Sequence, residues 1–280
     1  MTRLQTRDIA GIISRLTEYD AELKTKTGHT LMEIGCLAAG IEIADARNAI
    51  GRHSVCALTM TCGQGPIPGF AETLRAIAAH LGFVSFTVNG ANVAGLAEAV
   101  ENQADIILSA DDERFVAVNL KSRRVIDNRH STGKGFATGL TLLGSSRKIN
   151  RVLVIGCGPV GQSACLALAE DGVQVSVFDI CPKRCTTLAG RAHDLALARV
   201  AVVKDLKKAL ANHDYIVDAT PAKGIIDVDA ISDKTCISAP GVPLGVSRTA
   251  MAKLSGRLLH DPLQVGVATM LMAAIGTRRF

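Results

Sequence analysis

The sequence is poor in aromatic residues, with no Trp, two Tyr and seven Phe among 280 residues. Proteins that bind single-stranded nucleic acid stack bases on aromatic side chains, so this shortage argues against that class. The formal net charge is a modest +5, and Lys and Arg are scattered along the chain instead of forming a basic stripe. We therefore expect no nucleic-acid partner.

Long apolar runs are also missing. Residues 1–16 carry charges every few positions without the hydrophobic segment of a signal peptide, and no window reaches the length needed to cross a bilayer. We expect a cytoplasmic protein with no membrane partner.

The eight cysteines include no CxxC pair, and several fall within apolar strand or helix patterns. This usage is typical of reduced, buried thiols. The spacing of Cys181 and Cys185 is unlike that of structural zinc sites, so we expect no metal.

Apolar residues make up 48% of the chain, and its length suits two α/β domains of about 130 to 150 residues each. The first half begins with helical periodicity that breaks near Gly40, and it then alternates strands with helices. This order predicts N-terminal helices followed by a small parallel α/β sheet. The expected elements cover residues 6–27, 31–49, 55–61, 70–82, 83–88, 93–103, 105–110 and 131–145.

The second half repeats the alternation of strands and helices, which predicts a doubly wound parallel sheet of the Rossmann type. We place the first domain at residues 1–146 and the second at residues 147–280, with a linker at 147–150. The fold class is therefore α/β with two domains.

A glycine-rich loop follows the apolar strand at residues 152–155 and opens a helix. Gly156 permits a tight turn, Gly158 lets a pyrophosphate approach the backbone, and Gly161 lets the helix pack close to the sheet. The helix N-terminus then presents unpaired N–H groups to the phosphates. The expected cofactor loop consists of Gly156, Cys157, Gly158, Pro159, Val160 and Gly161. A Rossmann-like domain that has lost its cofactor is the alternative.

Asp179 ends the second strand of this half, eighteen residues after Gly161. A carboxylate at that place accepts hydrogen bonds from both ribose hydroxyls and repels a 2′-phosphate, so we expect NAD as the cofactor instead of NADP. Lys183 and Arg184 follow closely and offer the opposite preference if their loop folds back over the site.

Two further turns follow strands of the second half. Thr220-Pro221 and Pro240-Gly241 interrupt the strands, and we expect them to line the ribose and nicotinamide ends of the cofactor. Ordinary turn chemistry is the alternative for both.

With these residues in place, the chain resembles the pyrrolysine synthase (PylD) family over nearly its whole length, most weakly between residues 28 and 53. The resemblance rests on Gly63-Gln64-Gly65, Phe83-Val84-Ser85-Phe86, Ser109-Ala110-Asp111-Asp112, the loop from Gly156 to Gly161, Asp218-Ala219-Thr220-Pro221, Ile237 to Pro243, and Pro262-Leu263.

The resemblance implies an NAD-dependent oxidation of lysine-Nε-(3-methylornithine), with loss of ammonia and closure of a pyrroline ring. It also implies that Asp111 contacts the substrate as a catalytic residue, because a carboxylate complements an ammonium or a developing iminium. Surface solvation beside Asp112 is the alternative for Asp111, and alternation along the chain is expected to point Asp112 the other way. Further substrate candidates that the resemblance implies are Leu4, Gln64, Asn128 and Thr132.

Two other functions remain open at this point. One is another NAD-linked amine or amino-acid dehydrogenase or cyclase, and the other is a non-catalytic NAD-binding protein. A small-molecule substrate is expected in the first case, and a homodimer is compatible with the sequence.

Overall fold

The computed structural model describes residues 4–144, 149–197 and 199–276. Within these ranges the chain forms two compact units. Unit 1 contains residues 25–28 and 132–262, and unit 2 contains residues 4–24, 29–131 and 263–276. No helix in the described ranges is both long and apolar enough to cross a membrane.

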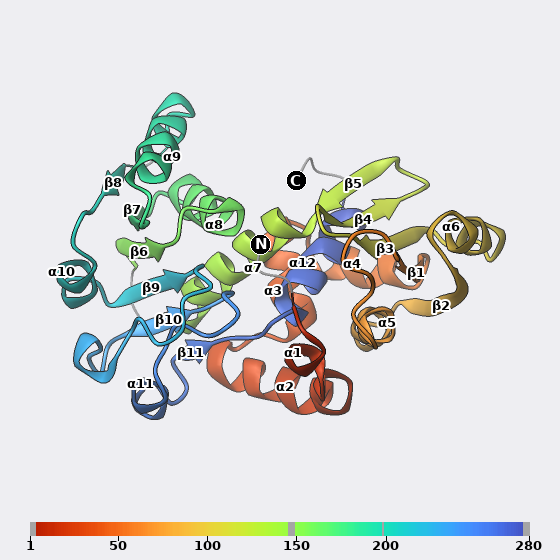
Figure 1. The fold of residues 1–280 in the computed structure, drawn as a ribbon, viewed down its shortest axis with the longest axis horizontal. Coiled ribbons are helices and arrows are strands. Elements are labelled where there is room, and N and C mark those ends of the chain that lie inside the picture. The colour runs from red at the N-terminus through yellow and green to blue at the C-terminus, as the bar shows by residue number, and fades with distance from the viewer. Residues whose placement is uncertain (1–3, 145–148, 198, 277–280) are drawn as a thin grey trace. The chain divides into compact units, whose positions relative to one another are not determined.

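Unit 1 holds a six-stranded sheet in the order β11-β10-β9-β6-β7-β8, with every pair parallel (Figure 1). The strands are β6 (Arg151–Ile155), β7 (Gln174–Phe178), β8 (Val200–Val202), β9 (Tyr215–Asp218), β10 (Cys236–Ser238) and β11 (Leu258–Leu259). The helices are most of α7 (Asn128–Leu143), α8 (Pro159–Glu170), α9 (Pro182–Asp194), α10 (Leu206–Ala211), η1 (Val228–Ala230) and α11 (Arg248–Lys253). The strand order reverses between β6 and β9, which is where ligands bind in doubly wound sheets.

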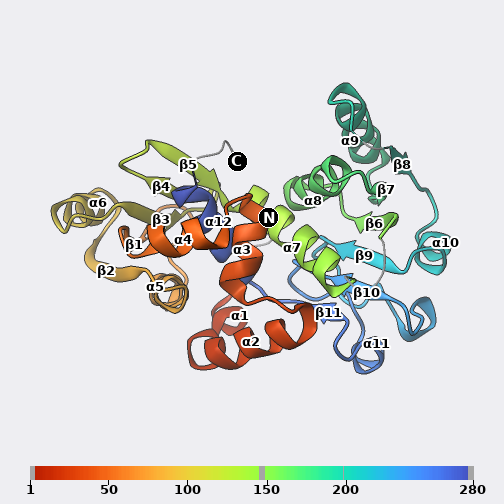
Figure 2. The ribbon, with the colours of Figure 1, turned by 180° about the vertical axis from the view of Figure 1, so that it is seen from behind.

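Both faces of this sheet are covered, which explains the unbroken apolar sequence of β6. Val152 and Val154 pack in one cluster with residues of α7, α8 and α9. Leu153 and Ile155 pack in a second cluster with residues of α10 and α11. The ribbon views show the helices on the two faces of this sheet (Figures 1 and 2). The predicted Rossmann sheet is therefore confirmed.

Unit 2 holds a five-stranded sheet in the order β2-β1-β3-β4-β5. The strands are β1 (Ser54–Thr59), β2 (Val84–Ala91), β3 (Ile106–Ala110), β4 (Phe115–Asn119) and β5 (Arg124–Asp127). The helices are α1 (Thr6–Ile9), most of α2 (Ile12–Thr27), α3 (Leu31–Ala39), α4 (Ile43–Ile50), α5 (Phe70–His80), α6 (Asn92–Glu101) and α12 (Gln264–Ile275). Gly40 ends α3 in the left-handed conformation, at the break that the sequence predicted.

The sheet of unit 2 is larger than the sequence indicated. β1, β2 and β3 are parallel, as expected, but β4 and β5 add an antiparallel pair beside β3. The burial of β4 alternates between buried and half-buried residues, which is the pattern of a half-covered strand, and the βαβαβ prediction left this pair out.

The last helix also differs from the expected division. α12 lies in unit 2, whereas the sequence assigned its residues to the second domain. Gln264–Ala274 are all buried, and α12 contacts α3, α5, β4 and β5. A Cβ on Gly35 of α3 would come within 3.0 Å of the Ala268 backbone, so the two helices pack very closely. The expected boundary between residues 146 and 147 lies outside the described residues.

Candidate functional site

The glycine loop between β6 and α8 makes a tight turn in close contact with neighbouring backbone. Gly156 has a positive φ of 91°, and a Cβ there would lie 2.9 Å from the Ala219 carbonyl oxygen. A Cβ on Gly161 would overlap the carbonyl oxygen of Gly156, so α8 and the end of β6 are in direct backbone contact. These two glycines serve packing and turn geometry, as the sequence predicted.

Gly158 differs from the other two glycines. It is the N-cap of α8 with an ordinary extended backbone, and a Cβ there would meet no atom within 4 Å. Its glycine is therefore not needed for packing inside the chain. No side chain caps α8, and Pro159 occupies its first turn. The space beside this uncapped helix N-terminus is open, and the binding of a pyrophosphate there stays a prediction.

Cys157 contributes its backbone to the loop and its side chain to the core. Its thiol is buried, with Sγ 3.6 Å from Sγ of Cys185 on α9, and burial raises its pKa. Its N–H donates to Oδ2 of Asp179 over 2.7 Å. Val160 is half-buried in the first turn of α8.

Asp179 braces the glycine loop from the end of β7. Its Oδ2 accepts the Cys157 N–H, and its Oδ1 accepts the Cys181 N–H over 2.8 Å. Its side chain is 6% exposed, and Nη1 of Arg184 lies 3.9 Å from Oδ2. The brace is an additional role, and a ribose contact by the same carboxylate stays a prediction.

Thr220 lies at the junction of two loops at the carboxyl edge of the unit 1 sheet. A Cβ on Gly156 would come within 3.0 Å of Thr220 Cγ2, and a Cβ on Gly241 would overlap the Thr220 carbonyl oxygen. Gly241 also donates its N–H to the Asp218 carbonyl oxygen over 3.3 Å. The glycine loop, Thr220-Pro221 and Pro240-Gly241 are thus brought together, as the strand ends predicted.

Asp111 lies in the turn between β3 and β4. Its Oδ1 accepts the N–H groups of Glu113 at 2.8 Å and Arg114 at 2.7 Å, and these bonds lower its pKa. The carboxylate is therefore ionised at neutral pH and holds the turn. Both bonds use Oδ1, and a contact between this carboxylate and a substrate stays a prediction.

Asp112 is more engaged than the sequence suggested. Its Oδ2 accepts the Gln64 N–H over 2.8 Å, and a Cβ on Gly63 would overlap that same oxygen. Gly63 has a positive φ of 66°. Asp112 therefore ties the glycine-rich loop after β1 to the turn after β3, and Gln64 is held through its backbone.

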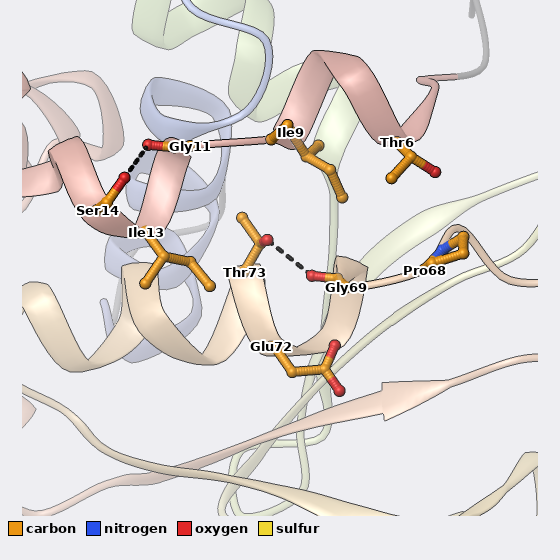
Figure 3. Close-up of a pocket in the computed structure, with 10 residues that line it drawn as sticks. Thr6, Ile9, Gly11, Ile13, Ser14, Pro68, Gly69, Glu72 and Thr73 are labelled. Carbon is orange, nitrogen blue, oxygen red and sulfur yellow. Dashed lines mark hydrogen bonds between the residues drawn. The ribbon is translucent and has the colours of Figure 1, made fainter.

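The remaining substrate candidates are spread along the chain. Leu4 is half-buried just before α1, Asn128 is buried at the start of α7, and Thr132 lies one turn further along the same helix. A shallow hollow separates α1 and the start of α2 from the first turn of α5 (Figure 3). Its lining includes Ile9, Ile13 and Glu72, but none of the substrate candidates.

Three further residues of unit 1 were not among the site residues that the sequence predicted. They are Asp218 at the end of β9, His260 directly after β11, and Gly245 in the loop that follows β10. Asp218 precedes the Thr-Pro turn that drew attention, so its position at a strand end was the available signal.

Each half of the chain matches a known protein family. Residues 8–126 match the family model described as pyrrolysine biosynthesis protein PylD, N-terminal domain, and residues 141–236 match shikimate / quinate 5-dehydrogenase. Pyrrolysine synthase of Methanosarcina acetivorans is 29% identical over 279 residues, which cover 98% of this chain and 100% of the relative. The pyrrolysine synthase of Methanosarcina barkeri is also 29% identical, covering 98% of each chain.

The fold has solved counterparts as well. Quinate dehydrogenase from Corynebacterium glutamicum in complex with NAD superposes with a TM-score of 0.54 at 14% identity, covering 79% of this chain and 92% of the other. The two-domain α/β fold is therefore that of the shikimate dehydrogenase type. The resemblance to pyrrolysine synthases is confirmed along nearly the whole chain.

Proposed function

We propose that this chain is an NAD-dependent dehydrogenase of pyrrolysine biosynthesis that oxidises lysine-Nε-(3-methylornithine) at its terminal amine carbon. The observation that carries the proposal is the similarity to two pyrrolysine synthases over 98% of the chain, which spans both units. A glycine loop with open space at Gly158 supports the use of a dinucleotide.

The reaction balances as an oxidation followed by a ring closure. The terminal ammonium first loses a proton to water, and the carbon that bears the neutral amine then gives a hydride to NAD and becomes an iminium. The second amine adds to the iminium carbon, ammonia leaves, and a C=N bond remains in the five-membered ring. When bound, NAD supplies the hydride acceptor. The chain must orient the amine-bearing carbon and curl the substrate so that the second amine reaches it.

Asp111 is the residue whose carboxylate is proposed to contact the amine of the substrate. The Glu113 and Arg114 N–H groups keep it ionised, and an ionised acceptor favours an ammonium and then an iminium. Leu4, Gln64, Asn128 and Thr132 are the proposed neighbours of the substrate. The backbone bond from Gln64 to Asp112 fixes the loop that carries this side chain.

NAD is proposed over NADP because Asp179 places a carboxylate at the end of β7. Its side chain is nearly buried and accepts two backbone N–H groups, so the negative charge is held in one place. A 2′-phosphate brought beside that charge is repelled. Lys183 and Arg184 are exposed on α9, and the positive charge of Arg184 partly offsets the repulsion of a 2′-phosphate by Asp179.

The deciding experiment is incubation of the purified chain with NAD and the lysine–methylornithine amide. Mass spectrometry should show a product that has lost ammonia and two hydrogens, together with reduced cofactor at 340 nm. The match of residues 141–236 to shikimate / quinate 5-dehydrogenase makes a hydroxy-acid dehydrogenase the second candidate. Turnover of quinate or shikimate without turnover of the amide would replace the proposal by that candidate.

A further inference from the structure

Asp218 is a fully buried carboxyl group at the carboxyl end of β9. Its Oδ1 accepts the Thr220 N–H at 3.2 Å and the Thr220 hydroxyl at 2.7 Å. Its Oδ2 lies against Gly245, where a Cβ would overlap it, and the Gly245 N–H acts on this oxygen electrostatically without reaching hydrogen-bond geometry. A buried, half-satisfied carboxyl is costly, so it calls for an explanation beyond packing.

The carboxyl acts on one structural feature, the turn at Thr220. Thr220 is confined on two sides, by Gly156 of the cofactor loop and by the backbone of Gly241. Its hydroxyl also accepts the Ala222 N–H over 3.3 Å, which closes the turn. A change in the bonds between Asp218 and Thr220 therefore shifts the wall of the proposed cofactor site directly beside Gly156.

The raised pKa of Asp218 brings its change between the protonated and the ionised form close to neutral pH. Burial raises the pKa of Asp218 to about 6, against the Thr220 hydrogen bonds, the nearby His260 and the Gly245 N–H, which lower it. His260 is the titratable group whose charge acts on this carboxyl, and its Nδ1 is bonded to the Ala239 carbonyl oxygen at 2.7 Å. A carbonyl only accepts, so the Nδ1 of neutral His260 carries the proton.

We infer that Asp218 is a positioning residue whose ionised carboxylate holds Thr220 against the glycine loop and thereby sets the affinity for the dinucleotide. The ionised form offers Oδ1 as a strong acceptor to both Thr220 donors. The protonated form weakens these bonds and loosens the turn. This inference rests on the proposed dinucleotide site but not on the identity of the amine substrate.

Calorimetric titration of the full chain with NAD between pH 5 and 8 tests the inference. The unmodified chain should bind NAD about tenfold more weakly at pH 5 than at pH 8, with the change centred near pH 6. Asp218→Asn keeps the shape but removes the charge, so it should bind at pH 8 as weakly as the unmodified chain does at pH 5, without pH dependence. Thr220→Val should also bind NAD weakly and without pH dependence. Thr220→Ser should bind NAD as the unmodified chain does, because serine keeps the hydroxyl.

His260→Asn is the matched control, because Asn keeps a donor for the Ala239 carbonyl and removes the imidazole ring. It should retain the pH dependence. Equal NAD affinity of Asp218→Asn and the unmodified chain at pH 8 would overturn the inference, as would loss of the pH dependence in His260→Asn alone. Thermal melting of each variant shows that the fold is kept. Normal NAD binding without turnover of the lysine–methylornithine amide would refute the proposed substrate and leave the role of Asp218 standing.

Discussion

Two glycines of one loop should respond to alanine in opposite ways. Gly158→Ala places a methyl group in open space where the pyrophosphate is expected, so the fold should survive and NAD binding should fail. Gly161→Ala places the same methyl group on the carbonyl oxygen of Gly156, so the fold should suffer first. The contrast separates a glycine that serves a ligand from one that serves packing.

The magnitudes follow from the surroundings of each Cα. Overpacking costs about 1–3 kcal/mol, and at Gly161 the obstacle is backbone, which places the cost at the upper end. Alanine regains up to about 1 kcal/mol of helix propensity in α8. A net loss of about 2 kcal/mol corresponds to a fall in Tm of about 4–8 °C. Gly158→Ala loses only the slight N-cap advantage of glycine, which is less than about 1 kcal/mol.

Thermal melting and NAD calorimetry on the same preparations provide the assay. We expect Gly158→Ala to lose at least about tenfold in affinity, which is about 1.4 kcal/mol. Gly190→Ala on α9 is the matched control, because a Cβ there also meets no atom within 4 Å but lies outside the loop. It should keep NAD affinity and gain slightly in Tm. Unchanged NAD affinity in Gly158→Ala would refute the assignment of the phosphate cradle.

Three further outcomes are expected. Asp218→Asn should raise the free energy of unfolding at pH 8 by up to about 3 kcal/mol, measured by urea titration. The reason is that a raised folded pKa makes the native state bind more protons, so the stability that Asp218 contributes is present below pH 4 and is lost as pH rises through 6. Gly63→Ala should make the loop after β1 susceptible to limited proteolysis, because its Cβ would displace the Asp112 carboxylate from the backbone it holds. A thiol reagent under native conditions should label Cys62 and Cys181 quickly and the six buried cysteines slowly, as peptide mapping can check.

The Rossmann half was predictable because each of its elements has a sequence signal within a few residues. Three local signals mark it: an apolar run before Gly156, proline at position 159, and an apolar run that leads to Asp179. The structure then places the glycine loop, Thr220 and Gly241 at one sheet edge, since parallel strands bring their carboxyl ends to the same side.

The first half was less predictable because its surprises depend on distant partners. The β4–β5 pair belongs to the sheet only through its register with β3. The helix α12 looks locally like the last helix of a Rossmann domain, and its membership of unit 2 depends on packing against α3, far away in the sequence. Asp111 and Asp112 are adjacent in the sequence, and only the structure shows that Asp112 holds the Gln64 backbone.

Asp218 shows why a sequence motif can predict a turn correctly and still not indicate the role of a residue within it. In sequence, the Thr-Pro pair draws attention because both residues shape turns, and the aspartate before them resembles an ordinary turn-former. Its burial depends on the loops around Gly241 and Gly245, which pack against it in the folded chain. A neutral side chain of the same size would satisfy Thr220 with a smaller desolvation cost, so stability alone favours asparagine at this place. An ionisable group beside the cofactor loop is better explained by what its charge does for the bound ligand.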